Sequence, residues 1–111
     1  MPFFGMSRLP AKEVAPGVEV QAFSGKKMTL TLFTMTPGSE VPGHAHPHEQ
    51  MGTVLKGAIE LFIGDEKRVV RPGDCWLIPS NVVHRGVCLD ETSELLEFFS
   101  PCREDYAPAF K

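Results

Sequence analysis

Residues 38–57 read GSEVPGHAHPHEQMGTVLKG, and this stretch contains three of the four histidines of the chain. They are His44, His46 and His48, each separated from the next by one residue. A β-strand directs residues i, i+2 and i+4 to the same face, so in an extended chain these three side chains and Gln50 would share one side. From this pattern alone, a metal site and a solvent-exposed histidine cluster on a loop are both open.

The fourth histidine, His84, ends a second stretch, GDCWLIPSNVVH at residues 73–84. Imidazoles at neighbouring same-face positions, here His44 and His46, can bind one ion. A third imidazole from a distant strand completes a ligand set that suits Zn, Ni, Fe, Co or Cu. We expect His48, which follows a proline, to lie in the wall of the pocket or beside the ligands rather than on the ion.

Short apolar runs with a period of two, separated by turn residues, continue along the chain. Its ten glycines and ten prolines fall between these runs. A period of two is typical of half-buried strands, and closely spaced turn signals between strands indicate an all-β sandwich or barrel. Apolar residues at helical spacing occur in no long window free of glycine or proline. The expected strands are residues 18–23, 28–36, 52–55, 58–63, 68–71, 75–78, 82–89 and 94–100.

The length of 111 residues fits one domain, because domains usually have about 100–150 residues. We expect a single domain over residues 1–111, with a barrel core at about 18–100, an N-terminal arm at 1–17 and a C-terminal tail at 101–111. The net charge of −3 gives no broad basic face, so we expect no nucleic-acid partner.

The apolar runs are all shorter than the roughly 20 residues that a membrane helix needs. The start of the chain, MPFFGMSR, lacks the pattern of a signal peptide. The three cysteines, Cys75, Cys88 and Cys102, are odd in number and far apart, which favours reduced thiols buried in strands over a disulfide framework. We therefore expect a cytoplasmic protein with no membrane partner.

The two histidine-bearing stretches resemble the two sequence motifs of the cupin family. The first motif is glycine, five residues, HxH, three or four residues, glutamate, six residues and glycine. Residues 38–57 fit it except that Gln50 stands where the family usually has Glu, and residues 73–84 resemble the second motif with Asn81 where Gly is usual. The resemblance implies a small antiparallel jelly-roll barrel, commonly a homodimer, whose interior holds one divalent ion. The implied ligands are His44, His46, Gln50 and His84.

The presence of Gln50 has a chemical consequence. Three neutral imidazoles and one amide oxygen leave the double positive charge of the ion uncompensated by the protein. Such a centre should attract an anionic ligand and act as a strong Lewis acid. The sequence leaves the identity of the ion open among Zn, Ni, Fe, Mn and Co.

The end of the chain gives a narrower resemblance. Residues 95–106 read LLEFFSPCREDY and are similar to LLDxFSPPREDF in the KdgF-type pectin-degradation proteins, which also share HxHPHEQ with residues 44–50. These cupins open the ring of 4,5-unsaturated uronate monosaccharides to 5-keto-4-deoxyuronates. The resemblance implies that Glu97, Phe99 and Arg103 contribute to catalysis, with Glu97 in place of the Asp of the family.

A metal-dependent isomerase acting on a small, carboxylate-bearing sugar is the function we expect from this resemblance. Glu97 would transfer protons, and Arg103 would bind the carboxylate of the substrate through two hydrogen bonds. The residues alone, without the resemblance, favour plainer roles: Glu97 as an outward charge, Arg103 as a surface ion-pair partner and Phe99 as part of the core. Two other functions stay open: a cupin dioxygenase or oxidase with a redox metal, and a binding module that performs no chemistry.

Overall fold

The computed structural model describes residues 3–110. Residues 1–2 and 111, the ends of the expected domain, lie outside the described residues. The elements in chain order are the 3-10 helix η1 (Met6–Arg8) and the strands β1 (Lys12–Ala15), β2 (Val18–Ser24), β3 (Thr29–Met35), β4 (Glu40–His44), β5 (Glu49–Lys56), β6 (Ile59–Ile63), β7 (Glu66–Val70), β8 (Cys75–Ile78), β9 (His84–Cys88) and β10 (Ser93–Ser100). No helix among the described residues is long and apolar enough to cross a membrane.

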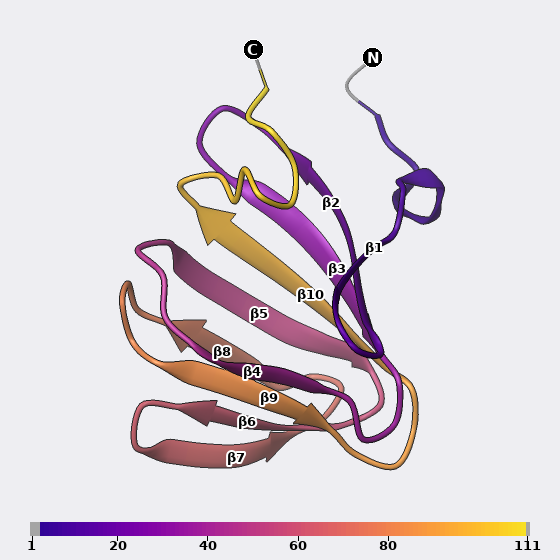
Figure 1. Cartoon of the computed structure of the whole chain (residues 1–111), viewed down its shortest axis with the longest axis vertical. Coiled ribbons are helices and arrows are strands. Elements are labelled where there is room, and N and C mark those ends of the chain that lie inside the picture. The colour runs from indigo at the N-terminus through magenta and orange to yellow at the C-terminus, as the bar shows by residue number, and fades with distance from the viewer. Residues whose placement is uncertain (1–2, 111) are drawn as a thin grey trace.

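The strands form two antiparallel sheets that pack face to face (Figure 1). The larger sheet has the order β1-β2-β3-β10-β5-β8, and the smaller sheet has the order β4-β9-β6-β7. The predicted all-β jelly-roll architecture is confirmed. Two strands were not predicted: β1, which lies in the stretch expected to be an N-terminal arm, and β4, whose sequence EVPGH contains both Pro and Gly.

Burial alternates along the central strands because successive side chains point to opposite sheet faces. In β3 the inward residues include Thr29 and Thr31 as well as Phe33 and Met35, all buried. The core between the sheets is formed by the buried residues Val18, Val20, Phe33, Met35, Val54, Ile59, Leu61, Val70, Trp76, Ile78, Cys88, Leu95 and Phe99. Each fully buried aliphatic or aromatic side chain stabilises the fold by about 1.5–3 kcal/mol relative to its exposed state.

The outer face of the larger sheet carries a row of apolar side chains that crosses five strands. Cross-strand pairing places Phe23 beside Leu30, Leu30 beside Phe98, Phe98 beside Met51, and Met51 beside Leu77. Phe98, Met51 and Leu77 are 44%, 53% and 52% exposed. Met51 lies on this outer face because it alternates along β5 with Gln50 and Gly52, which face inward.

The histidine-rich stretch passes from one sheet to the other. His44 ends β4 in the smaller sheet, and Glu49 begins β5 in the larger sheet. The assumption of a continuous extended segment over residues 44–50 was therefore wrong, and the residues between the two strands form a bend. The backbone N–H of Asn81 donates a hydrogen bond to the carbonyl of His46 at 2.7 Å. Asn81 has φ of 65°, the left-handed conformation that Asn tolerates well.

The C-terminal tail returns along the ends of β2 and β3 after leaving β10 (Figure 1). The backbone N–H of Arg103 donates to Oγ1 of Thr29 at 2.9 Å, and Oγ of Ser24 donates to the carbonyl of Ala107 at 2.8 Å. The N–H of Phe110 donates to the carbonyl of Gly25 at 2.9 Å. These bonds hold the tail at one end of the space between the sheets.

Candidate metal centre and its cavity

Three histidines meet between the two sheets. His44 comes from the end of β4, His84 from the start of β9, and His46 from the bend that follows β4. One ring nitrogen of each residue lies within 4.8 Å of those of the others. His44 and His84 are also cross-strand partners in the smaller sheet, which explains why residues so far apart in sequence adjoin. His48 is not part of this group.

Backbone carbonyls fix the protonation of the three rings. Nδ1 of His44 lies 2.8 Å from the carbonyl oxygen of Pro42. Nδ1 of His46 lies 3.0 Å from the carbonyl oxygen of His48, and Nδ1 of His84 lies 2.9 Å from that of Val82. A carbonyl oxygen only accepts, so each Nδ1 must carry the hydrogen. Each Nε2 then has a free lone pair, and this is the tautomer that metal-binding histidines adopt when a backbone carbonyl orients them.

Gln50 completes the group with an amide oxygen. Its Oε1 lies 3.1 Å from Nε2 of His46. Two atoms that bind one ion at about 2.0–2.2 Å lie roughly 3 Å apart, as these two do. Nε2 of His84 is buried and has no hydrogen-bond partner among residues 3–110. The residues present therefore fit a divalent transition-metal ion.

Burial favours the neutral form of two of these imidazoles, His84 and His46. Desolvation is the main cause that lowers the pKa of His84 to about 4, and nearby His44, His46 and Arg103 lower it further. Burial also lowers the pKa of His46, followed by the positive charge of Arg103. A metal binds the neutral form of imidazole, so at neutral pH neither ligand has to lose a proton first.

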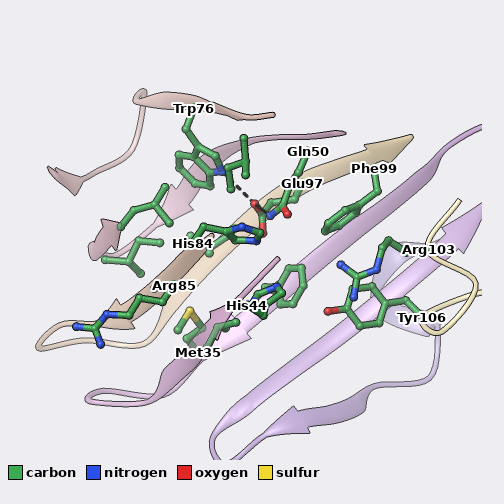
Figure 2. Close-up of a pocket in the computed structure, with 17 residues that line it drawn as sticks. Met35, His44, Gln50, Trp76, His84, Arg85, Glu97, Phe99, Arg103 and Tyr106 are labelled. Atoms are coloured by element: carbon green, nitrogen blue, oxygen red, sulfur yellow. Dashed lines mark hydrogen bonds between the residues drawn. The ribbon is translucent and has the colours of Figure 1, made fainter. Parts of the chain in front are cut away.

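The carboxylate of Glu97 lies beside the side-chain amide of the candidate ligand Gln50 (Figure 2). Nε2 of Gln50 and Nε1 of Trp76 both donate to Oε2 of Glu97, the latter at 3.0 Å. Because a carboxylate only accepts, this contact turns the amide so that its oxygen points to the histidines. Glu97 is 6% exposed, and burial raises its pKa despite the two donors. Glu97 is therefore an inward residue, not an outward strand charge.

Trp76 is a further residue of the site, and the sequence motifs do not single it out. Cross-strand pairing puts Trp76, Gly52 and Glu97 in one row over β8, β5 and β10. A Cβ on Gly52 would lie 2.6 Å from the indole ring, so only glycine lets the indole cross β5 and reach Glu97. The sequence alternation does place Trp76 inward, but it gives no indication of this hydrogen bond.

The aromatic and cationic residues of the last segment form the other side of the site. Phe99 is 1% exposed, and its ring contacts that of His46 at a centroid distance of 5.9 Å. Arg103 is buried, and its Cζ lies 4.9 Å from the ring centroid of Phe99 and 4.1 Å from that of Tyr106. Sequence analysis did not identify Tyr106, because the tail has no strand periodicity.

A cavity joins these groups. Its volume is about 470 Å³ including the open mouth, and it is lined by 17 residues, most of them apolar. Every predicted site residue except His46 lines it, and His46 lies directly against Phe99. Figure 2 shows Trp76, Gln50 and Glu97 on one side of the histidines and Arg103 and Tyr106 on the other. Glu49 is exposed, as its place beside Gln50 in the strand predicts.

Residues 31–99, more than half of the chain, match the cupin domain. The chain belongs to the cupin family. It is 28% identical over 106 residues to the pectin degradation protein KdgF of Dickeya dadantii, covering 94% of this chain and 96% of that protein. The solved structure of KdgF from Halomonas sp. has a TM-score of 0.87 at 29% identity, covering 95% of this chain and 97% of that one. An RmlC-like cupin from Shewanella frigidimarina has a TM-score of 0.88 at 26% identity, with 96% of both chains covered.

The four candidate metal ligands of this cupin are all neutral side chains. The carboxylate nearest to them, Glu97, contacts Gln50 through the amide nitrogen and so lies behind the ligand. Arg103 adds a second positive charge on the same cavity. A site with a divalent ion and a buried guanidinium favours a small ligand that carries at least one negative charge.

The three cysteines differ in burial. Cys88 and Cys102 are buried, whereas Cys75 is exposed on the edge strand β8. The expectation that all three are buried in strands was therefore wrong for Cys75, and Cys102 follows the last strand. All three are free, as expected.

Proposed function

We propose that this cupin is a metal-dependent isomerase of pectin degradation that opens 4,5-unsaturated uronate monosaccharides to 5-keto-4-deoxyuronates. The observation that carries the proposal is one cavity lined by three neutral candidate ligands, the buried carboxyl of Glu97 and the buried guanidinium of Arg103, with the fourth candidate ligand, His46, against Phe99 in its wall. The similarity to the KdgF proteins supports the same function. The substrate class is a small sugar acid.

The reaction rearranges atoms within the substrate and needs no co-reactant. A proton leaves the anomeric hydroxyl, the bond between C1 and the ring oxygen breaks, and C1 becomes an aldehyde. The electron pair of that bond stays on the former ring oxygen, which forms an enolate with C5 and C4. Protonation at C4 then gives the ketone at C5. The proton that leaves the hydroxyl balances the proton gained at C4.

Each residue of the cavity has a role in this sequence. His44, His46, Gln50 and His84 would hold a divalent ion, which would supply Lewis acidity toward the developing negative charge. Arg103 binds the substrate carboxylate, Glu97 accepts and returns the proton, and Phe99 packs against the sugar and excludes water. General acid–base transfer of this kind typically contributes about 10²–10⁴-fold to the rate.

Oxygen chemistry with a redox metal is the second candidate function, because a three-histidine site without a carboxylate ligand can serve it. The two functions separate under nitrogen. We expect the protein to convert unsaturated galacturonate to the open-chain ketone without oxygen, with the product followed by proton NMR. Turnover that stops without oxygen and returns only with iron would favour the dioxygenase or oxidase. Binding without any turnover would favour a non-catalytic module.

We also propose that the protein acts as a homodimer in the cytoplasm. The apolar row from Phe23 to Leu77 gives the larger sheet an outer face that a second copy could cover in a sandwich, and free cysteines are typical of a reducing compartment. Light scattering should give twice the chain mass. Met51→Lys should give the monomer mass, whereas Val83→Lys, at an exposed position outside this face, should not. A monomeric wild type would contradict the dimer.

A further inference from the structure

Arg103 is already paired within the C-terminal segment. Its Nε and Nη2 donate to Oδ1 and Oδ2 of Asp105 at 3.1 and 2.9 Å. The side chain of Arg103 is 10% exposed, whereas that of Asp105 is 58% exposed. Asp105 therefore holds the buried guanidinium from the rim of the cavity, on its solvent side.

This pairing determines which edge of the guanidinium remains for a ligand. The group carries five N–H donors in a fixed plane. Asp105 accepts from Nε and from one N–H of Nη2, which together form the side edge. Three N–H groups remain, and two of them, one on Nη1 and one on Nη2, lie next to each other at the end of the side chain. That pair matches the two oxygens of a second carboxylate.

Aromatic rings and the backbone fix the guanidinium further. Its Cζ lies 4.1 Å from the ring centroid of Tyr106, and Tyr106 packs edge to face against Phe33 and Phe99 at 5.8 and 5.9 Å. The N–H of Tyr106 donates to the carbonyl of Arg103 at 2.9 Å, which closes the turn that contains Asp105. In Figure 2 the end of Arg103 lies above the ring of Tyr106 and extends toward His44.

We propose that Asp105 is a positioning residue, which occupies the side edge of Arg103 and thereby presents its end edge to the carboxylate of a ligand at the metal centre. The proposal rests on the proposed function in taking a sugar acid as the ligand. Without Asp105 the guanidinium keeps its charge but loses its fixed direction, so ligand binding has to immobilise a flexible side chain. A purely structural role for Asp105 would change stability and leave ligand affinity unchanged.

The test measures binding of D-galacturonate, which lacks the C4=C5 double bond and cannot react. Galacturonate is titrated into the metal-loaded protein, and binding is monitored by the fluorescence of Trp76. Trp76 is the single tryptophan of the chain and lies in the cavity wall. Galactose, which has no carboxylate, is the matched ligand. Glu104→Gln is the matched control, because Glu104 is an exposed acid beside Asp105.

We expect Arg103→Met to raise the Kd for galacturonate by about 10-fold or more, the loss of a charged bidentate contact. Asp105→Asn should raise it by about 10-fold, Asp105→Glu should restore much of the affinity, and Glu104→Gln should have no effect. The double variant of Arg103→Met and Asp105→Asn should bind no more weakly than Arg103→Met alone. Affinity for galactose should stay the same throughout.

Three results would overturn the proposal. They are wild-type affinity in Asp105→Asn, additive losses in the double variant, and a wild-type protein that binds galacturonate no better than galactose. Turnover of unsaturated galacturonate by the wild type separately reports the proposed function. If the wild type turns over the substrate and Asp105→Asn binds galacturonate with wild-type affinity, the isomerase function stands and the positioning role of Asp105 is wrong. If galacturonate binding depends on Asp105 but the wild type shows no turnover, the positioning role is supported and the isomerase function is wrong.

Discussion

The side-chain amide of Gln50 donates to the buried carboxylate of Glu97 while its oxygen lies 3.1 Å from Nε2 of His46. The carboxylate thus decides which end of the amide faces the candidate metal centre. Partners behind metal ligands commonly contribute about 10–100-fold to metal affinity or activity. In this cupin the same residue is also the proposed proton carrier.

Glu97→Gln should therefore affect two measurements. The new amide can donate as well as accept, so Gln50 can turn its nitrogen to the histidines, and we expect metal affinity to fall about 10-fold. Turnover at saturating metal should fall by about 100-fold or more, because an amide does not accept the proton. Calorimetric titration with zinc measures the first effect. Unchanged zinc affinity would show that Glu97 does not orient Gln50.

Replacing Gly52 should disturb the site through Trp76. In Gly52→Ala the added methyl group would lie 2.6 Å from the indole, so the ring must move and its hydrogen bond to Glu97 is lost. We expect a loss of about 1–3 kcal/mol of unfolding free energy, as for other overpacked cores, and a changed fluorescence spectrum of Trp76. Gly43→Ala is the control, because no atom of residues 3–110 lies within 4 Å of the corresponding Cβ. Equal stability of the two variants would contradict the packing described here.

Metal content should depend on the histidines that meet between the sheets. The wild type should hold about one divalent ion per chain, and His84→Ala should lose most of it because one nitrogen ligand is removed. His48→Ala should keep the ion, since His48 is not in the group of three. Elemental analysis of dialysed protein measures both. Full metal content in His84→Ala would mean that His84 is not a ligand.

The metal-free protein should lose stability in mild acid through His84. Its folded pKa is about 4, below the ordinary value of 6.5, so between these pH values the unfolded chain binds a proton that the folded chain does not. The contribution of this group is present above pH 6.5 and is lost as pH falls toward 4. The loss is about 2–3 kcal/mol. The raised pKa of Glu97 acts in the opposite direction.

A comparison with His84→Asn separates the two groups, because both proteins keep Glu97. Urea unfolding of the metal-free proteins at pH 7 and pH 4.5 gives the difference in unfolding free energy at each pH. That difference should shrink at pH 4.5. A constant difference would show that His84 is not held neutral by burial.

Much of this site could be predicted because its residues belong to compact motifs. The spacing around His44 and His84 identifies the candidate ligands, and strand parity puts Glu97 and Phe99 on one inward face, where both are buried. The path between the ligands was not predictable, since Pro47 lies in a bend that carries the chain from one sheet to the other. The period of two identifies a strand but does not show which of the two sheets that strand joins.

Contacts between residues that are adjacent only through strand register, or through irregular backbone, were not predicted. The contact of Trp76 with Glu97 requires Gly52 between them in a third strand, and cross-strand register is not readable from a single strand. Asp105 and Tyr106 lie in a tail held by Thr29, a buried polar residue of β3. No local pattern indicates that such a tail closes the cavity.

The most direct test of the account is the ultraviolet absorbance of the conjugated C4=C5 bond of unsaturated galacturonate during incubation with the metal-loaded protein. Zn, Ni, Mn, Co and Fe are each tested, and chelator-treated protein and Arg103→Met serve as controls. The account predicts a rapid loss of absorbance with at least one of these metals, no loss after metal removal, and a slower loss with Arg103→Met. Absorbance that stays constant with all five metals, for this substrate and its unsaturated uronate epimers, would contradict the isomerase function.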